Sequence, residues 1–199
     1  MVEGVFLNGF VTDTFLLTCE NNMLPDTLSL QQLFTVPVAD KQHFAEALHQ
    51  KHATDFLRQD DLRADLELLQ NFARRVSRHM AKLEMGKMCV RCAAGSGGGC
   101  CSLFMAGETD AVQMLMNMLV GVPIRQVRGD GSECCYLGEK GCLFTFKPIF
   151  CLNYNCKSIR DGVSSENVTE LERLTGQLLG KQYEVEKKLL ELIGRRINR

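Results

Sequence analysis

The stretch from Asp60 to Leu83, DDLRADLELLQNFARRVSRHMAKL, carries the most regular hydrophobic pattern of the chain. Its apolar residues recur at steps of three and four positions: Leu62, Leu66, Leu69, Phe72, Ala73, Val76, Met80 and Leu83. This spacing places them on one side of an α-helix. Gly86 follows, and glycine takes the left-handed conformation of a helix end at little cost. The pattern therefore predicts a long helix that packs along one side and ends near Gly86.

A second helical pattern precedes this stretch. Asp40 suits the N-cap position, and Phe44, Leu48 and Phe56 form part of an apolar face on a helix that ends near Arg58. The expected helix contains three of the four histidines of the chain. His49, His52 and Asp55 share one face of the expected helix, where a solvated polar surface is favoured over a second metal site.

The C-terminal part predicts a third long helix, of roughly 30 residues. Asn167 and Glu170 have the spacing of a capping box at its start. The positions that form its inner face are Leu171, Leu174, Leu178, Gln182, Val185, Leu189 and Ile193. They follow a period of 3.6 residues and not a strict heptad, which favours packing on the protein's own helices over a homodimer through this helix.

Length and composition limit the function classes. The chain has 199 residues, 45% of them hydrophobic, and a net charge of −1, which suits one domain at about 150 residues per domain. The small net charge excludes the broad positive field of a general nucleic-acid binder. No apolar run approaches the roughly 18 residues of a membrane span. Residues 1–40 contain no Lys or Arg, so the positive region of a secretory signal is missing and a cytoplasmic protein is expected.

Cysteines are concentrated in one part of the chain. Cys19 stands alone, and the other nine of the ten lie between Cys89 and Cys156. In a reducing cytosol this density predicts metal binding or redox chemistry before disulfides. The spacing of Cys89 and Cys92 brings both thiolates into one coordination sphere if the intervening turn folds back. The candidate metal ligands are Cys89, Cys92, Cys100, Cys101, Cys134, Cys142, Cys151 and Cys156, with Cys135 in reserve.

The residue types indicate which metal to expect. All four histidines precede the cysteine-rich segment, so the nearest ligands are thiolates, which suit zinc or an iron–sulfur cluster and disfavour magnesium and calcium. Gly95–Gly99 either donates backbone N–H groups to metal-bound sulfur or simply connects the first two cysteine pairs. No Ser/His/Asp or Cys/His constellation can be specified, so catalytic residues are not assigned and enzymatic activity stays open.

Regular structure is also expected inside the cysteine-rich segment. Positions 109–121 fit a short helix capped by Thr109 or Asp110 and ended by a glycine. Residues 124–128 fit a strand. Residues 134–137 and 142–146, separated by positions 138–141, fit a β-hairpin with a glycine-containing turn.

The segment from Cys89 to Cys156, about a third of the chain, resembles the CxxCxxCC (YkgJ-like) cysteine-cluster family, described as zinc- or iron-chelating proteins. The first cluster of that family corresponds to Cys89, Cys92, Cys100 and Cys101, with seven residues between the second and third cysteines where the family has two. The later elements of the family correspond to Cys134-Cys135-Tyr136-Leu137, Gly141-Cys142, Lys147-Pro148 and Cys151, with Lys147 in place of an arginine.

The resemblance implies a zinc or iron–sulfur centre. The family includes flagellin lysine N-methylase, but this chain has no glycine-rich methyl-donor motif, so methyl transfer rests on analogy. Four functions therefore stay open: a metal-binding protein with thiolate-ligated zinc or iron–sulfur centres, a structural-zinc interaction module, a metal-delivery protein, and a methyltransferase-related iron–sulfur enzyme. The expected partners are the metal ion and, through the C-terminal helix, a protein or a second copy.

Together these patterns predict a mainly α (α+β) protein in which long helices flank a small metal-binding lobe with a β-hairpin. Residues 1–88 form the N-terminal segment and helical scaffold, 89–156 the cysteine-rich lobe, and 157–199 the C-terminal helix of a single compact domain.

Overall fold

The computed structural model of the chain describes residues 28–95, 99–129 and 133–197, so Cys19 lies outside the described residues. Its helices are α1 (Gln32–Thr35), α2 (Val38–Leu57), α3 (Asp60–Lys82), α4 (Met85–Ala93), α5 (Leu103–Gly107), α6 (Ala111–Leu119), α7 (Ile149–Asn153), α8 (Lys157–Gly162) and α9 (Ser165–Ile197). The strands β1 (Leu137–Gly138) and β2 (Gly141–Cys142) form an antiparallel hairpin. The expected mainly helical fold with a small hairpin is confirmed.

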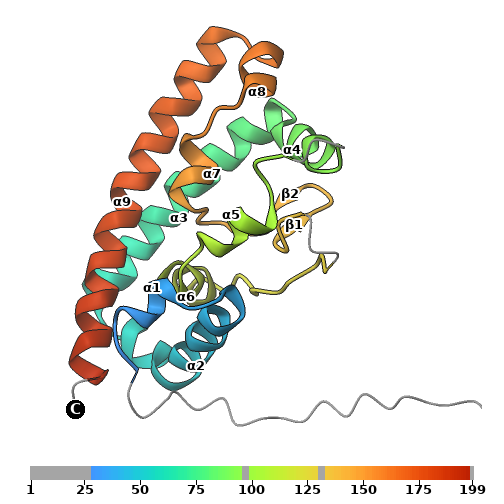
Figure 1. Ribbon diagram of the computed structural model, residues 1–199. Coiled ribbons are helices and arrows are strands. Elements are labelled where there is room, and N and C mark those ends of the chain that lie inside the picture. Colours follow the sequence, from blue (N-terminus) through green and yellow to red (C-terminus); the bar gives the residue numbers. More distant parts are fainter. Residues whose placement is uncertain (1–27, 96–98, 130–132, 198–199) are drawn as a thin grey trace, which may run out of the picture.

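The two longest helices, α3 and α9, run antiparallel along one side of the molecule (Figure 1). All seven positions expected on the inner face of α9 are buried, and five of the eight expected on α3 are buried as well. Ion pairs border this apolar contact: Asp65 Oδ1 lies 2.5 Å from Lys181 Nζ, and Asp61 Oδ2 lies 3.1 Å from Lys188 Nζ. The apolar stripe of α9 is therefore covered by the protein's own helices, as its 3.6-residue period predicts.

The end of α3 differs from the sequence prediction. The helix ends at Lys82, and the left-handed residue that follows is Glu84, with φ of 53°. Gly86 lies instead in the first turn of α4. A Cβ atom there would lie 2.1 Å from the backbone oxygen of Lys140. The assignment of Gly86 as the helix stop is wrong, because this glycine allows the hairpin turn to pack directly on α4.

The start of α9 also differs. The helix begins at Ser165, so Asn167 lies in its first turn and not at its cap. The hydroxyl of Ser164 accepts a hydrogen bond from the backbone N–H of Asn167 at 3.4 Å. Glu170 pairs with Arg173 at 2.7 Å and does not reach back along the chain. The predicted capping box is therefore wrong, and a serine three residues earlier does the capping.

Helix α6 is buried between the scaffold and the cysteine-rich lobe. It starts as predicted, since the carboxylate of Asp110 accepts from the backbone N–H of Gln113 at 2.7 Å. It is followed by Gly121 with φ of 80°. Val112, Met114, Leu115 and Met116 have no exposed surface, so α6 forms the centre of the core.

Two β predictions are corrected. Residues 124–128 form no strand, although the N–H of Val127 donates to the backbone oxygen of Cys135 at 2.8 Å. The hairpin is shorter than expected, with Leu137 opposite Cys142 and Gly138 opposite Gly141. One further hydrogen bond, from the N–H of Leu143 to the oxygen of Tyr136 at 3.0 Å, continues the pairing, and beyond it the N–H groups of Thr145 and Phe146 donate to the Asn117 side chain of α6.

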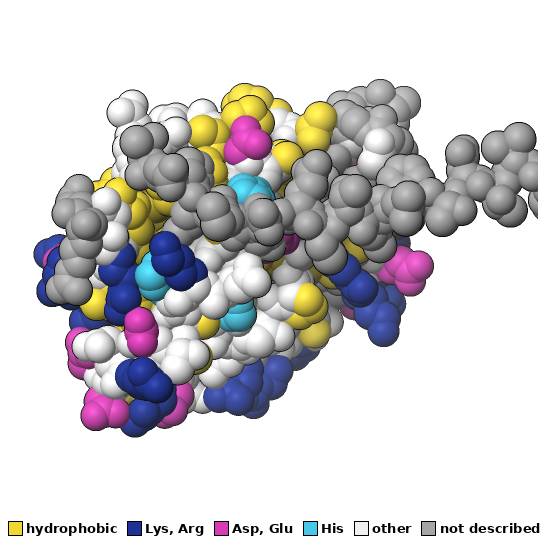
Figure 2. Space-filling view, turned by 90° about the horizontal axis from the view of Figure 1, so that it is seen from below, with side chains coloured by type: hydrophobic (Ala, Val, Ile, Leu, Met, Phe, Trp, Pro, Cys, Tyr) yellow, Lys and Arg dark blue, Asp and Glu magenta, His cyan; other side chains and the backbone are white. Residues whose placement is uncertain are grey.

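The surface at the α2 end of the molecule mixes charges of both signs (Figure 2). Histidine side chains lie as separate spots on the visible part of this face, not in one group. None of the helices described is long and apolar enough to cross a membrane.

Candidate metal centre

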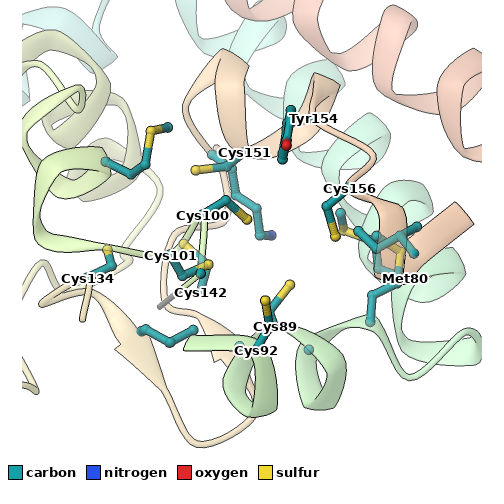
Figure 3. Close-up of a pocket in the computed structure, with 18 of the residues that line it drawn as sticks. Met80, Cys89, Cys92, Cys100, Cys101, Cys134, Cys142, Cys151, Tyr154 and Cys156 are labelled. Carbon is teal, nitrogen blue, oxygen red and sulfur yellow. The ribbon is translucent and has the colours of Figure 1, made fainter. Parts of the chain in front are cut away.

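A cavity of about 960 Å³ opens between α3, α4, the hairpin, α7 and α8. Eight cysteines line it: Cys89, Cys92, Cys100, Cys101, Cys134, Cys142, Cys151 and Cys156. These are the eight residues that the sequence singled out as ligands. Their side chains surround the central space from several sides (Figure 3). Cys135, the reserve ligand, is buried and is not part of the cavity wall.

Helix α4 carries the first pair of cysteines. Cys89 and Cys92 lie three positions apart within this helix, so their side chains project from the same face. Both point into the cavity in Figure 3. The sequence prediction of a turn that folds back is wrong here, but one helical turn brings the two sulfur atoms to one side equally well.

Two short segments place the next three cysteines. The N–H of Cys134 donates to the backbone oxygen of Cys101 at 3.0 Å, and Ser102 forms a β-bridge with Glu133. The hydroxyl of Ser102 also accepts from the N–H of Met105 and caps α5. Cys100 and Cys101 are thus held beside Cys134, more than 30 positions later in the chain.

The last three cysteines depend on the chain between β2 and α8. Cys142 ends the hairpin, Pro148 precedes the first turn of α7, and Cys151 lies within that helix. Cys156 is the residue before α8. Proline suits the position before α7, because its φ is already that of a helix start and its missing N–H would have no helical partner there.

The thiols near α4 hydrogen-bond to one another. The Cys101 thiol donates to the sulfur atoms of Cys100 and Cys89, which lowers the pKa of Cys100 to about 6 and lowers the pKa of Cys89. The same hydrogen bonds raise the pKa of Cys101. Two sulfur atoms here favour the thiolate, which is the form that nucleophiles and metal ligands require.

Three other thiols of the cavity wall have a raised pKa, which favours the protonated form. Burial raises the pKa of Cys134 to about 11 and that of Cys151 to about 12, and the nearby sulfurs add to both shifts. Burial and the neighbouring Cys100 and Cys156 raise the pKa of Cys92. A metal bound by these cysteines would have to displace protons, so its affinity would rise with pH.

The sulfur atoms surround a space and do not converge on one point. Within 28–95, 99–129 and 133–197, no three His, Cys, Asp or Glu side chains are grouped so as to hold a metal ion. All nine cysteines of this segment are free thiols. The disulfide scaffold that competed with metal binding is therefore absent from the described residues.

The histidine face of α2 is engaged in other contacts. Asp55 pairs with Arg196 at 3.0 Å and with Arg58 at 3.5 Å. The Arg196 guanidinium also lies 3.5 Å from His52 Nδ1. These contacts tie α2 to the end of α9.

Several residues of the cavity wall were not identified from the sequence as part of the site. Met80, Met85 and Met105 are apolar residues of three different helices, and their periodicity indicates only burial. Lys147 was noted only as a departure from the family motif, and Tyr154 carried no signal. Comparison with models of protein families, with curated proteins and with solved structures finds no match.

Proposed function

We propose that the protein binds a thiolate-ligated metal centre in this cavity. The observation that carries the proposal is the convergence of eight free cysteines from distant parts of the chain on one cavity. A cysteine that serves only as a small apolar residue is buried by itself in the core, as Cys135 is. The order of the cysteine motifs, which resembles that of the CxxCxxCC family, supports the same proposal.

The donor set fits a soft metal. The cavity wall contains no Asp, Glu or His among its described residues, so the available ligands are thiolates. Thiolates select zinc and iron–sulfur clusters over magnesium or calcium. We expect the eight cysteines of the cavity wall to supply the ligands of one or two centres: Cys89, Cys92, Cys100, Cys101, Cys134, Cys142, Cys151 and Cys156.

The width of the cavity favours an iron–sulfur cluster over a single zinc ion. A structural zinc site needs four ligands converging on one point, with sulfur atoms about 2.3 Å from the metal. Sulfur atoms that surround a space of about 960 Å³ suit a centre that contributes several atoms of its own. Such a cluster would supply electron transfer when bound.

A structural-zinc interaction module is the second candidate, supported by apolar side chains around the cavity. Phe150 and Tyr154 line the cavity and are 54% and 59% exposed. Ile149, the residue before Phe150, is 53% exposed, and Phe104, the residue before Met105 of the cavity wall, is 74% exposed. Exposed large apolar side chains that gather near one place indicate a contact surface. The third candidate, a methyltransferase-related iron–sulfur enzyme, rests on the family resemblance alone. In each case a reducing compartment such as the cytosol would keep the thiols free.

Elemental analysis and an absorption spectrum of anaerobically purified protein test the proposal. Iron with sulfide and a brown colour would identify the cluster, whereas tightly bound zinc in colourless protein would identify the interaction module. Removal of either metal by a chelator should lower the thermal stability, because ligand binding to the native state stabilises it.

Serine substitutions provide a matched comparison. Cys89→Ser and Cys142→Ser should lose most of the bound metal, since each removes a sulfur from the cavity wall. Cys135→Ser changes a buried cysteine of the same lobe that lies outside the cavity wall and should retain it. Wild-type protein without metal, with its thiols paired as disulfides, would refute the proposal.

A further inference from the structure

The cavity wall contains a lysine among the thiols. Lys147 is half-buried and lines the same cavity as the eight cysteines. No carboxylate among the described residues lies within ion-pair distance of its ammonium group. Lys157, which also lines the cavity, differs: its Nζ lies 2.6 Å from Asp161, and its side chain is 88% exposed.

The backbone around Lys147 is held on both sides. The backbone of the preceding residue, Phe146, makes two hydrogen bonds with the Asn117 side chain. Asn117 Oδ1 accepts from the Phe146 N–H at 3.0 Å, and Asn117 Nδ2 donates to the Phe146 oxygen at 2.9 Å. The oxygen of Lys147 itself accepts from Gln182 Nε2 of α9 at 3.2 Å. Pro148 then starts α7. The backbone position from which the Lys147 side chain starts is therefore built into the fold.

Its charge acts on sulfur atoms from three elements. Cys89 on α4, Cys142 at the end of β2 and Cys151 in α7 line the same cavity as Lys147. Partial burial removes some of the water around an ammonium group, so negative charge in the same cavity stabilises that group.

We propose that Lys147 supplies the compensating positive charge of the thiolate centre and thereby strengthens its hold on metal. This inference rests on the proposed function: four thiolates around a divalent metal leave a charge of −2, by the usual charge count. An ammonium group beside that charge stabilises the loaded state, because metal binding fixes the ligands as thiolates.

The first test measures metal affinity by competition with a chelator. Lys147→Met keeps the length of the side chain and removes its charge. It should weaken metal binding about tenfold. Lys147→Arg should restore most of the affinity, because it restores the charge. Lys157→Met is the matched control and should bind as the wild type does. Equal affinities of Lys147→Met and wild type would overturn the inference.

The second test measures the charge in the cavity without metal. Iodoacetate is an anion and iodoacetamide is neutral, but both alkylate the same thiolates. Peptide mass spectrometry gives the two alkylation rates at Cys89, Cys142 and Cys151. The iodoacetate rate divided by the iodoacetamide rate does not depend on the fraction of thiolate, because both reagents need the thiolate. Lys147→Met should lower this ratio about fivefold, and Lys147→Arg and Lys157→Met should keep it near the wild-type value.

The two tests separate the two proposals. If the purified wild type contains no metal, the proposed function fails, and the alkylation ratio on that protein still decides whether Lys147 sets the charge of the cavity. If metal binds but Lys147→Met changes neither affinity nor ratio, the centre stands and the role of Lys147 is refuted. A loss in Lys147→Met that Lys147→Arg does not rescue would also refute it, since it would show a structural role.

Discussion

The backbone oxygen of Lys140 lies 2.1 Å from the position that a Cβ atom on Gly86 would occupy. Gly141, the next residue, has φ of 113°, and a Cβ atom there would lie 3.1 Å from the Cα atom of Gly86. Helix α4 and the hairpin turn thus meet backbone to backbone. This contact holds Cys89 and Cys142 on two walls of one cavity.

We predict that Gly86→Ala destabilises the protein and weakens its hold on metal. The added methyl group overlaps backbone, which cannot turn aside as a side chain can, so a cost of about 1–3 kcal/mol in the free energy of unfolding is expected. Urea denaturation followed by circular dichroism measures it. Gly176→Ala is the control: that glycine lies in α9 with nothing within 4 Å of the added Cβ, and alanine should stabilise the helix by up to about 1 kcal/mol.

Gly99→Ala should reduce metal binding with little change in stability. A Cβ atom at this position would lie 3.0 Å from the Cys92 sulfur and 3.1 Å from the Ala93 nitrogen. The methyl group would push that sulfur away from its place in the cavity. Metal content per protein measures the effect. Gly107→Ala, in α5 with open space around the added atom, should keep the metal content of the wild type, and a loss in both variants would contradict the explanation.

Asn117→Leu should destabilise the protein by roughly 2–4 kcal/mol, because it leaves buried groups without hydrogen bonds. The Asn117 side chain is buried and bonds to Gln113, Thr145 and Phe146 at 2.9–3.0 Å. The loop that it holds leads to Lys147 and α7, so metal content should fall as well. Thermal unfolding and elemental analysis measure both effects. Asn71→Leu, an exposed position bonded to Arg74 alone, should leave both nearly unchanged.

Glu186→Gln should stabilise the protein at alkaline pH. Burial, and next the nearby Asp110 carboxylate, raise the pKa of Glu186 from 4.5 to about 7. The folded state therefore holds this proton more tightly than the unfolded state, and stability falls as pH rises from about 4.5 to about 7. Glutamine removes that penalty, so the gain should reach roughly 2 kcal/mol above neutral pH and vanish near pH 4. Unfolding curves of the two proteins across pH measure it, and parallel profiles would contradict the assignment.

The sequence by itself determined the helical scaffold and the identity of the sulfur atoms at the site. A period of 3.6 residues in α3 and α9 identifies the buried faces because a helix repeats its direction at that interval. Cysteine density indicates all eight cysteines of the cavity wall because so many thiols in a short segment have few structural uses. These are local properties, encoded within a few turns of chain.

The tertiary structure alone decided how those parts meet. The space between the sulfur atoms depends on three long-range contacts. They are the packing of Gly86 on Lys140, the hydrogen bond from Cys134 to Cys101, and the hydrogen bonds between Asn117 and the Phe146 backbone. Each contact joins residues about 30 or more positions apart. The local sequence around either residue does not predict which residue it will contact. The place of Lys147 among the thiols follows from the same long-range packing. Residues far apart in the sequence come close only when the whole fold pairs its backbone hydrogen-bonding groups and packs its buried side chains, so these contacts cannot be predicted from any one segment.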